Sequence, residues 1–292
     1  MTADPEAPEL KTLIAEPHEA YTLLDSGDGR KLERYGPYRF IRPEPQAMWR
    51  PATKDWQADG EFLPAADADG GGRWHLADGV PESWPLGRGN VRFHAANTPF
   101  RHLAFFPDMA PQWDWMASRT GANDEVMNLF GYTGLGSLIL ADRGAKVTHV
   151  DASKKAVAAA RDNQALSGMQ DRPIRWLVED ALKYAEREVR RGRRYDGIVL
   201  DPPKFGRGPK GERWELTETL PELLRTLADL LDENSKYLVL TAYAVRMSAL
   251  SLGILMKEVL PHGRIEMGEM TVREQARGLL LPTAIFARWM PA

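Results

Sequence analysis

From about residue 123 onward, short apolar runs alternate with longer segments whose apolar residues recur at helical spacing. Strands are expected at residues 124–130, 146–151, 173–179, 195–200 and 236–243, and helices at 135–144, 153–168, 181–192, 214–231 and 247–259. Such alternation predicts a parallel sheet with helices on both faces. Two last strands, at 264–270 and 283–289, have no helix between them, so one of the two should run antiparallel. The expected fold class is therefore a doubly wound α/β sheet.

The first third of the chain has a different pattern, with short β-prone runs separated by Gly- and Pro-rich turns. We expect residues 1–20 to be a flexible arm, 21–97 a small β-rich domain, 98–121 a bridging loop and helix, and 122–292 the main domain. In the bridging segment, Asp108 is a candidate cap and Pro111 suits the first helical turn. Four of the nine tryptophans lie in the small domain, where they are expected to form its core.

Composition excludes several classes of protein. The 38 Lys and Arg residues balance 41 Asp and Glu, so a strongly basic nucleic-acid binder is not indicated, although a local basic patch remains compatible. Cysteine is absent, which excludes disulfides, thiolate metal sites and a cysteine nucleophile. We expect no metal. The N-terminus lacks the apolar core of a signal peptide, and no apolar run approaches the roughly 20 residues of a membrane helix. A cytoplasmic location without membrane contact is expected.

Two features that suit a nucleoside ligand follow the first two strands of the main domain. The turn NLFGYTGLG contains Gly131, Gly134 and Gly136, which let the backbone bend tightly and approach a ligand. Its spacing differs from the G-x-G-x-x-G of nicotinamide enzymes. Asp151 ends the second strand, 20 residues after Gly131, where a carboxylate can accept from both ribose hydroxyls. The alternative is a helix cap, a role that Ser153 serves equally well.

The ends of the third and fourth strands carry further carboxylates. Glu179 and Asp180 could accept from an adenine amino group, or could cap the next helix. The fourth strand ends in Asp201-Pro202-Pro203-Lys204-Phe205, where the prolines remove two N–H donors. Carbonyls of this turn and Asp201 can then hold a nitrogen of the substrate, while Phe205 can stack on a flat base. A solvated turn is the alternative. All four segments belong to one sheet edge, where open α/β sheets bind ligands.

These motifs resemble those of class I S-adenosylmethionine-dependent methyltransferases, in the branch of bacterial 23S rRNA cytosine-C5 and guanine-N enzymes. The likeness covers about residues 98–292, with NLFGYTG, HVDAS, VEDAL and DPPKF as successive motifs, and FFPDMAPQWDW resembles a pre-core element. It implies a seven-stranded sheet with a reversed last strand. The N-terminal region does not resemble the PUA domain of the cytosine-C5 enzymes. The expected cofactor-binding residues are Phe106, Gln112, Asn128, Phe130, Gly131, Tyr132, Thr133, Gly134, Asp151, Ala152, Ser153, Glu179, Asp180 and Asp201.

The sequence departs from the cytosine-C5 enzymes at the catalytic cysteine, because Ala244 occupies the matching place. A chain without cysteine cannot form their covalent adduct. Methylation of a nitrogen suits DPPKF better, since it requires orientation and acceptors rather than a strong nucleophile. The catalytic candidates are Asp201, Pro202, Pro203 and Phe205.

The expected partner is ribosomal RNA. Residues 183–213 hold ten Lys or Arg against five Asp or Glu, and Lys204, Arg207 and Lys210 are the candidate phosphate contacts. Much of the run could equally be a solvated surface. A methyltransferase for a small molecule or protein is the first alternative, and a nicotinamide-dependent oxidoreductase or a non-catalytic cofactor-binding subunit are less favoured. Oligomeric state is not predicted.

Overall fold

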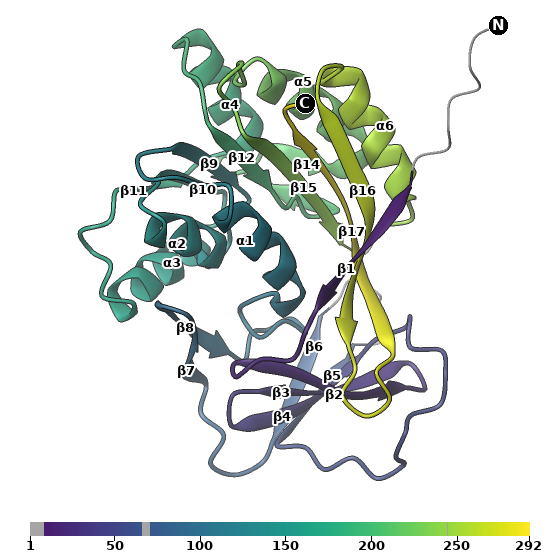
Figure 1. Cartoon of the computed structure of the whole chain (residues 1–292). Coiled ribbons are helices and arrows are strands. Elements are labelled where there is room, and N and C mark those ends of the chain that lie inside the picture. The colour runs from purple at the N-terminus through teal and green to yellow at the C-terminus, as the bar shows by residue number, and fades with distance from the viewer. Residues whose placement is uncertain (1–8, 66–70, 244) are drawn as a thin grey trace, which may run out of the picture.

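A large sheet of eight strands forms the centre of the main domain (Figure 1). The computed structural model describes residues 9–65, 71–243 and 245–292. The strand order is β1-β16-β17-β15-β12-β9-β10-β11. The strands are β1 (Leu10–Ala15), β9 (Glu125–Leu129), β10 (Lys146–Asp151), β11 (Ile174–Val178), β12 (Gly197–Leu200), β15 (Tyr237–Tyr243), β16 (Arg264–Arg273) and β17 (Leu280–Met290).

The strand directions confirm the expected α/β class. Strands β9, β10, β11, β12 and β15 pair in parallel, and β17 runs antiparallel to both β15 and β16. The expectation of seven strands is corrected by β1, which pairs in parallel with β16 from Leu10 to Ala15. Part of the segment expected to be a flexible arm is therefore an edge strand. A strand of six residues is stable at this edge because Leu13 and Ala15 contribute to the core beside β16.

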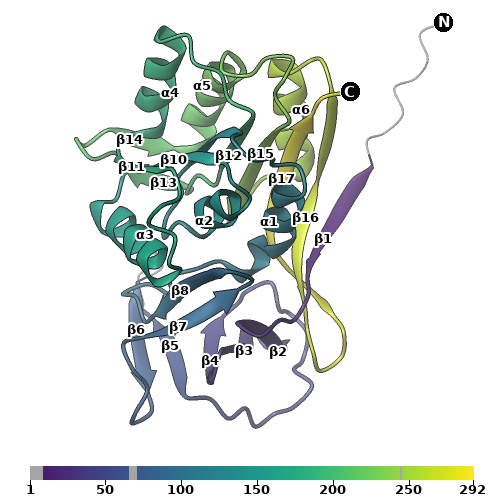
Figure 2. The same ribbon diagram turned by 60° about the vertical axis from the view of Figure 1, so that its left-hand side comes forward.

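Helices cover both faces of the sheet (Figure 2). One face carries α1 (Ala110–Ala117), α2 (Leu135–Asp142) and α3 (Lys154–Leu166), and the other carries α4 (Ala181–Arg190), α5 (Leu216–Ala228) and α6 (Ala249–Val259). Each face has its own buried apolar cluster. Apolar burial on both faces explains why the central strands are nearly continuous hydrophobic runs. Within the described residues, no helix is long and apolar enough to cross a membrane.

A smaller β region lies beside the α1 face of the sheet (Figure 1). It contains a five-stranded sheet and a two-stranded ribbon. The sheet consists of β2 (Tyr21–Gly27), β3 (Arg30–Tyr35), β4 (Tyr38–Pro43), β5 (Gly60–Pro64) and β6 (Gly72–Leu76), and the ribbon of β7 (Ser83–Arg88) and β8 (Val91–Ala96). Its buried aromatic residues join the α1-face cluster. The β16–β17 hairpin also reaches it, because the backbone N–H of Gln275 donates to Leu23. The two parts are thus packed as one body.

The short segment that leads into α1 differs from the expected capped helix. A 3-10 turn, η1 (Pro107–Met109), comes first, and Met109 is the residue before the helix. Asp108 makes no capping hydrogen bond; its side chain is buried instead. Pro111 does lie in the first turn of α1, as expected. The buried position of Asp108 places a carboxyl near the sheet edge rather than at a helix surface.

A buried ion pair in the small β region gives a testable stability effect. Arg42 Nε lies 2.6 Å from Glu33 Oε2, and the Arg42 guanidinium also donates to the carbonyl of Arg101. Burial alone would raise the pKa of Glu33, but the charges of Arg42 and Lys31 outweigh it and hold that pKa at about 2. Ionised Glu33 therefore stabilises the fold at pH values above the ordinary pKa of a carboxyl group. This contribution is lost as the pH falls towards 2.

We expect Glu33→Gln to lower the free energy of unfolding by about 3–5 kcal/mol at neutral pH, because it leaves Arg42 buried without a counter-charge. Urea unfolding at several pH values measures this, and the difference from wild type should shrink as pH falls. Glu16→Gln is the matched control, since Glu16 makes an exposed ion pair with Arg273, the kind that contributes about 0–1 kcal/mol. Equal losses in both variants would contradict the expectation.

Candidate active site

A pocket opens at the carboxyl ends of the central strands. One wall is formed by the η1–α1 segment, through Phe105, Phe106, Met109 and Trp113. The opposite wall and floor come from β9 and the turn after it, and from the end of β12, through Asn128, Phe130, Gly131, Tyr132, Thr133, Leu135, Gly136, Val199 and Asp201. The pocket therefore lies where the sheet edge was expected to bind a ligand, with an aromatic lid segment over it.

The turn between β9 and α2 is bent into a loop of backbone groups. Phe130, Tyr132 and Gly134 have φ angles of 56°, 50° and 83°, all in the left-handed region. A Cβ on Gly131 would lie 2.5 Å from the His149 ring. Such a contact is impossible without a shift of the ring, so this glycine allows the turn to close over β10. Phe130 and Tyr132 are not glycines, so their left-handed conformation is costly, and such strain is typical of functional sites.

A buried polar network supports this turn from below. Asn128 Nδ2 donates to Ser137 Oγ at 2.9 Å, and Ser137 Oγ lies 3.0 Å from His149 Nδ1. Burial lowers the pKa of His149 to about 3, so the ring is neutral at physiological pH. Asn128 also lines the pocket. The network thus fixes the floor beneath the glycine turn without adding a charge.

Asp151 holds the turn rather than capping a helix. Its carboxylate accepts from the backbone N–H of Tyr132 at 2.9 Å and of Ser153 at 2.8 Å. Burial raises the pKa of Asp151, against the lowering effect of these two donors. Ser153 is the N-cap of α3, accepting from Ala156. Of the two roles weighed for Asp151, the helix cap belongs to Ser153. Asp151 does not itself line the pocket, but it holds the backbone of Tyr132, which does.

Glu179 and Asp180 have local partners. Asp180 is the N-cap of α4 and accepts from the backbone of Lys183. Glu179 forms an ion pair with Arg187 at 3.0 Å. The helix-cap alternative therefore applies to Asp180. Neither residue belongs to the pocket lining, so any adenine contact requires a ligand that extends beyond it towards β11.

The DPPKF turn leaves Asp201 facing the pocket. Its Oδ1 is buried and has no hydrogen-bond partner among the residues that the structure describes. Burial, followed by the charge of Asp108, raises the pKa of Asp201 well above its ordinary value. Phe205 is 58% exposed, and the Lys204 ammonium lies 5.0 Å from its ring centre. The turn thus presents a buried acceptor oxygen and, four residues later, an exposed aromatic ring.

Two carbonyls of this turn have internal partners. The carbonyl of Pro203 accepts from the Trp214 indole at 2.6 Å, and that of Lys204 accepts from the Leu216 N–H. These two carbonyls are engaged in holding a hairpin of β13 (Phe205–Arg207) and β14 (Arg213–Glu215). Each of the two oxygens therefore uses one of its two lone pairs within the protein. Asp201 and the carbonyls before Pro203 remain as the acceptors.

Sequence reasoning missed two polar side chains beside Asp201. The side chain of Asp108 and the Tyr243 hydroxyl are buried, and Tyr243 helps to lower the pKa of Asp108, which burial raises. The Tyr243 ring centre lies 5.1 Å from that of Phe106, a lining residue. No local sequence pattern marks either residue as functional, although Asp108 lies in the segment FFPDMAPQWDW that resembles a pre-core element. Ala244, the position weighed against the cysteine, lies outside the described residues.

Gln112 was expected to contact the cofactor, but it does not line the pocket. Its side chain is wholly buried, and its Oε1 accepts from Arg288 on β17 at 3.2 Å. It is absent from the pocket lining, whereas Trp113, one residue later on α1, is part of it. A helix rotates by about 100° per residue, so the neighbouring position faces the pocket instead.

Comparison with known proteins decides the family. A model of S-adenosylmethionine-dependent methyltransferases matches residues 65–258. The chain belongs to this family. A crystal structure of the S-adenosylmethionine-dependent methyltransferase from Agrobacterium tumefaciens is 42% identical, with a TM-score of 0.92 over 98% of this chain and 97% of that one. The methyltransferase fold and its cofactor, as predicted, are confirmed.

Other relatives of this methyltransferase are more distant or match only in part. A methyltransferase solved with S-adenosylhomocysteine is 15% identical, with a TM-score of 0.73 over 94% of this chain and 76% of that one, which shows the fold alone. Ribosomal RNA large subunit methyltransferase I of Shewanella denitrificans is 38% identical over 91 residues, or 31% of this chain and 23% of that protein. The K/L enzyme of Shewanella baltica is 35% identical over 120 residues, or 16% of its length. The match thus spans a quarter or less of these curated relatives.

The residues of the pocket fit this methyltransferase's cofactor. The glycine turn supplies a cradle that a Cβ on Gly131 would obstruct. Phe106 and Tyr132 supply aromatic surface, their ring centres 5.7 Å apart, and Asp151 holds the Tyr132 backbone from outside the lining. The unpartnered oxygen of Asp201 also requires a polar group from a ligand or from water.

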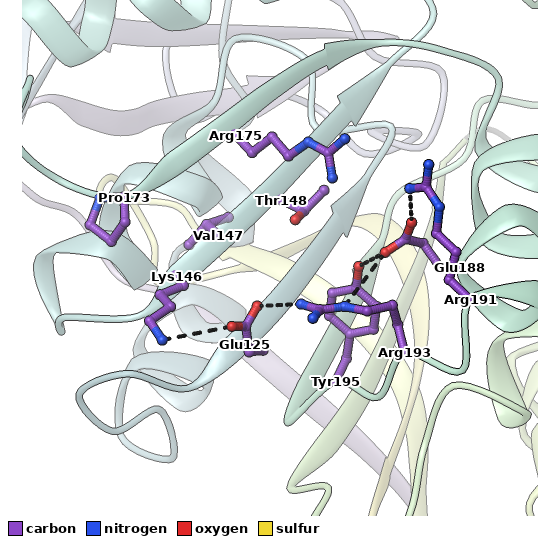
Figure 3. A pocket seen from close by; sticks show the side chains of 10 residues that line it. All are labelled: Glu125, Lys146, Val147, Thr148, Pro173, Arg175, Glu188, Arg191, Arg193 and Tyr195. Carbon is purple, nitrogen blue, oxygen red and sulfur yellow. Dashed lines mark hydrogen bonds and ion pairs between the residues drawn. The ribbon is translucent and has the colours of Figure 1, made fainter.

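A second pocket of this methyltransferase lies at the opposite, amino end of the strands (Figure 3). This cavity of about 380 Å³ is lined by four cations and two acids. Arg193 pairs with Glu125 at 3.2 Å, and Arg191 pairs with Glu188 at 2.9 Å (Figure 3). Part of the basic run at 183–213 is therefore used in internal ion pairs, and it lies away from the cofactor edge.

Proposed function

We propose that this methyltransferase transfers a methyl group to a nitrogen of a base in ribosomal RNA. The observation that carries the proposal is the unpartnered Asp201 oxygen in the cofactor pocket, followed four residues later by the exposed Phe205 ring. An acceptor that faces the cofactor beside a free aromatic face suits a flat base presented edge-on. The absence of cysteine removes the covalent route to cytosine C5.

The proposed cofactor site is built from the pocket and its rim. The turn at Gly131–Gly134 would hold the amino acid part, with Phe106 above it, while Asp151 would accept from the ribose hydroxyls. When bound, the cofactor supplies an activated methyl group. The adenine would lie towards Ala152, Glu179 and the Asp180 backbone.

The proposed catalytic work of the chain is orientation. Asp201 would accept a hydrogen from the acceptor nitrogen and so direct its lone pair at the methyl group. Pro202 and Pro203 fix the backbone of the turn and hold Asp201 in place. Phe205 would stack on the base, a contact worth about 1–3 kcal/mol in single-stranded nucleic acid binding.

RNA as the substrate class is supported by the hairpin that follows the turn. Lys204, Arg207 and Lys210 are exposed on or beside β13, and no ion pair with a carboxylate involves them in the described part of the chain. By contrast, Arg213 pairs with Glu215. Three unpaired cations beside a stacking ring suit a phosphate backbone. The partial matches to ribosomal RNA methyltransferases point the same way.

We expect the triple variant Lys204→Gln, Arg207→Gln, Lys210→Gln to weaken RNA binding by about 10-fold or more at low salt and to reduce the salt slope by about 2, since each phosphate contact on a single strand contributes about 0.7. Filter binding across a salt series measures both. Replacing Arg191, Arg193 and Arg194 by Gln is the matched control and should leave the slope nearly unchanged. A slope that both triple variants change equally would argue against the hairpin as the RNA contact.

The proposal is tested by incubating the enzyme with labelled S-adenosylmethionine and separate RNA, protein and small-molecule fractions of a cell extract. Label in large-subunit ribosomal RNA is the expected result. Label in the protein or small-molecule fraction alone would favour the alternative substrate class, for which the near-neutral overall charge is the favouring observation.

A further inference from the structure

Trp214 of β14 is a buried side chain that joins the DPPKF turn to the glycine turn after β9. Its indole N–H donates to the Pro203 carbonyl at 2.6 Å, and its ring centre lies 4.8 Å from that of Phe130. Trp214 is only 5% exposed, and Phe130 lines the pocket. One side chain of the hairpin therefore contacts both the turn that contains Asp201 and the turn that forms the pocket floor.

The hydrogen bond acts on the freedom of rotation that the two prolines leave open. The rings of Pro202 and Pro203 fix φ at about −65°, so the course of the chain after Pro203 depends on its ψ angle, which also directs its carbonyl. A donor on that carbonyl therefore fixes the peptide plane between Pro203 and Lys204. The next carbonyl, that of Lys204, accepts from the Leu216 N–H. Two successive peptide planes are thus held by β14 and the start of α5.

These two planes determine where Phe205 lies relative to Asp201. Asp201 precedes them and directly follows β12, a strand that β9 and β15 hold on either side. Phe205 follows the two planes and pairs with Glu215 across the hairpin, while Gly206 pairs with Trp214 itself. The separation between the proposed acceptor oxygen and the proposed stacking ring thus depends on the bond from Trp214.

The ring contact with Phe130 relates this geometry to the cofactor side of the pocket. Phe130 has a φ angle of 56°, a left-handed conformation that persists only where the surrounding structure holds it. The Trp214 ring packs against it with 57° between the two planes, in the apolar cluster on the α4 face. The contact thus helps to keep Phe130 in the conformation that lines the pocket.

We propose that Trp214 is a positioning residue for methyl transfer, whose indole N–H holds the DPPKF turn so that Asp201 and Phe205 face the acceptor together. The inference deepens the proposed function and rests on the roles that it assigns to Asp201 and Phe205. Trp214 is not among the residues that line the pocket, so it acts through Pro203 and Phe130 rather than on the reacting atoms. A displacement of about 1 Å at a reacting centre can lower the rate about 100-fold.

Trp289 is the matched control, because it makes the same kind of bond far from the pocket. Its indole N–H donates to the His262 carbonyl, also at 2.6 Å, and it is 6% exposed. It pairs with Leu238 near the start of β15, whereas the pocket lies at the carboxyl ends of the strands. Replacing either tryptophan by Phe removes one indole–carbonyl bond and part of one buried ring. A merely structural role therefore predicts the same result for Trp214→Phe and Trp289→Phe.

The test combines steady-state kinetics on unmodified large-subunit ribosomal RNA with calorimetry and thermal unfolding. We expect kcat about 10- to 100-fold below wild type in Trp214→Phe, with the KM for RNA within about threefold because the cations of the hairpin remain. The Kd for S-adenosylmethionine should stay within about threefold, since a phenyl ring still packs on Phe130. Trp289→Phe should lower the melting temperature by a similar amount and leave kcat within about twofold of wild type.

A second variant separates the hydrogen bond from the ring. Benzothienylalanine, in which sulfur replaces the indole N–H, keeps the size and aromatic surface of tryptophan and removes the donor. Placed at position 214 alone, it should reproduce the loss of kcat and lower the melting temperature by no more than about 2–4 °C, as expected for one hydrogen bond. Recovery of the wild-type kcat with this residue would show that ring volume, rather than the bond, is what matters.

The inference would be overturned by that recovery, by a wild-type kcat in Trp214→Phe, or by an equal loss of kcat in Trp289→Phe. A higher Kd for S-adenosylmethionine that accounts for the whole loss would also overturn it, because Trp214 would then serve cofactor binding. The proposed function is judged separately. If wild type labels only protein or small molecules, the proposed function fails, and the same variants are compared on that acceptor. A wild type that methylates no fraction of the extract would overturn both.

Discussion

Replacing Asp201 with Ala is expected to lower kcat by about 100- to 1,000-fold, the usual effect of removing a preorganised group at a reacting centre. The reason is that the buried Asp201 Oδ1 has no hydrogen-bond partner among the described residues, so it is free to bind the acceptor. The Kd for S-adenosylmethionine should stay within about fivefold, because the glycine turn and Asp151 hold most of the cofactor in the proposed site. Single-turnover kinetics and calorimetry separate the two effects.

Asp171→Ala serves as the control for this variant, because Asp171 is an exposed carboxyl in the loop before β11. It should leave kcat and Kd unchanged. Turnover of Asp201→Ala within a few-fold of wild type would contradict the catalytic assignment. A loss of kcat that accompanies an equal loss of cofactor affinity would place Asp201 in cofactor binding instead.

Replacing Asp151 with Ala should raise the Kd for S-adenosylmethionine by about 100-fold or more. Hydrogen bonds to a charged group contribute about 1.5–3 kcal/mol each, and ribose hydroxyls would lose their acceptor. The variant also frees the backbone N–H groups of Tyr132 and Ser153, which Asp151 now holds. Calorimetry gives the affinity, and thermal unfolding reports the loss of these internal contacts.

Ser153→Ala separates the two roles at this position. It removes the cap of α3, which contributes about 1 kcal/mol, and keeps the Asp151 carboxylate. We expect a lower melting temperature with a Kd within about threefold. If Ser153→Ala weakened the cofactor as much as Asp151→Ala, the effect would come from the helix start rather than from ribose recognition.

The sheet and the glycine turn could be predicted because their causes are local. Apolar runs at regular intervals define the strands, and parallel strands bring their carboxyl ends to one edge. Asp151 and Asp201 could therefore be assigned to the same sheet edge from sequence. The pairing of Asp108 with Tyr243 could not be predicted, because the two residues lie far apart in the chain and neither has a distinctive neighbourhood. Their meeting depends on how η1 packs across the sheet.

Other differences between the prediction and the structure arise because nearby groups in the protein bond to the predicted site residues. Asp180 sits at the start of a helix, and the free N–H groups there take its carboxylate first. The Pro203 and Lys204 carbonyls of the DPPKF turn accept from Trp214, which lies in a hairpin, and from Leu216, which follows it; the short strands of this hairpin gave no clear pattern. The edge strand β1 was missed because six residues beside a polar N-terminus look like a tail until β16 is placed next to them.

The central claim, methyl transfer to a base nitrogen at the DPPKF turn, is tested most directly by mass spectrometry of nucleosides. Unmodified large-subunit ribosomal RNA would be treated with the enzyme and S-adenosylmethionine carrying a heavy methyl group, then digested. The account predicts a labelled nucleoside with the methyl group on a base nitrogen, and at least about 100-fold slower labelling with Asp201→Ala. A heavy methyl group on carbon 5 of cytosine, or on a ribose oxygen, would contradict it.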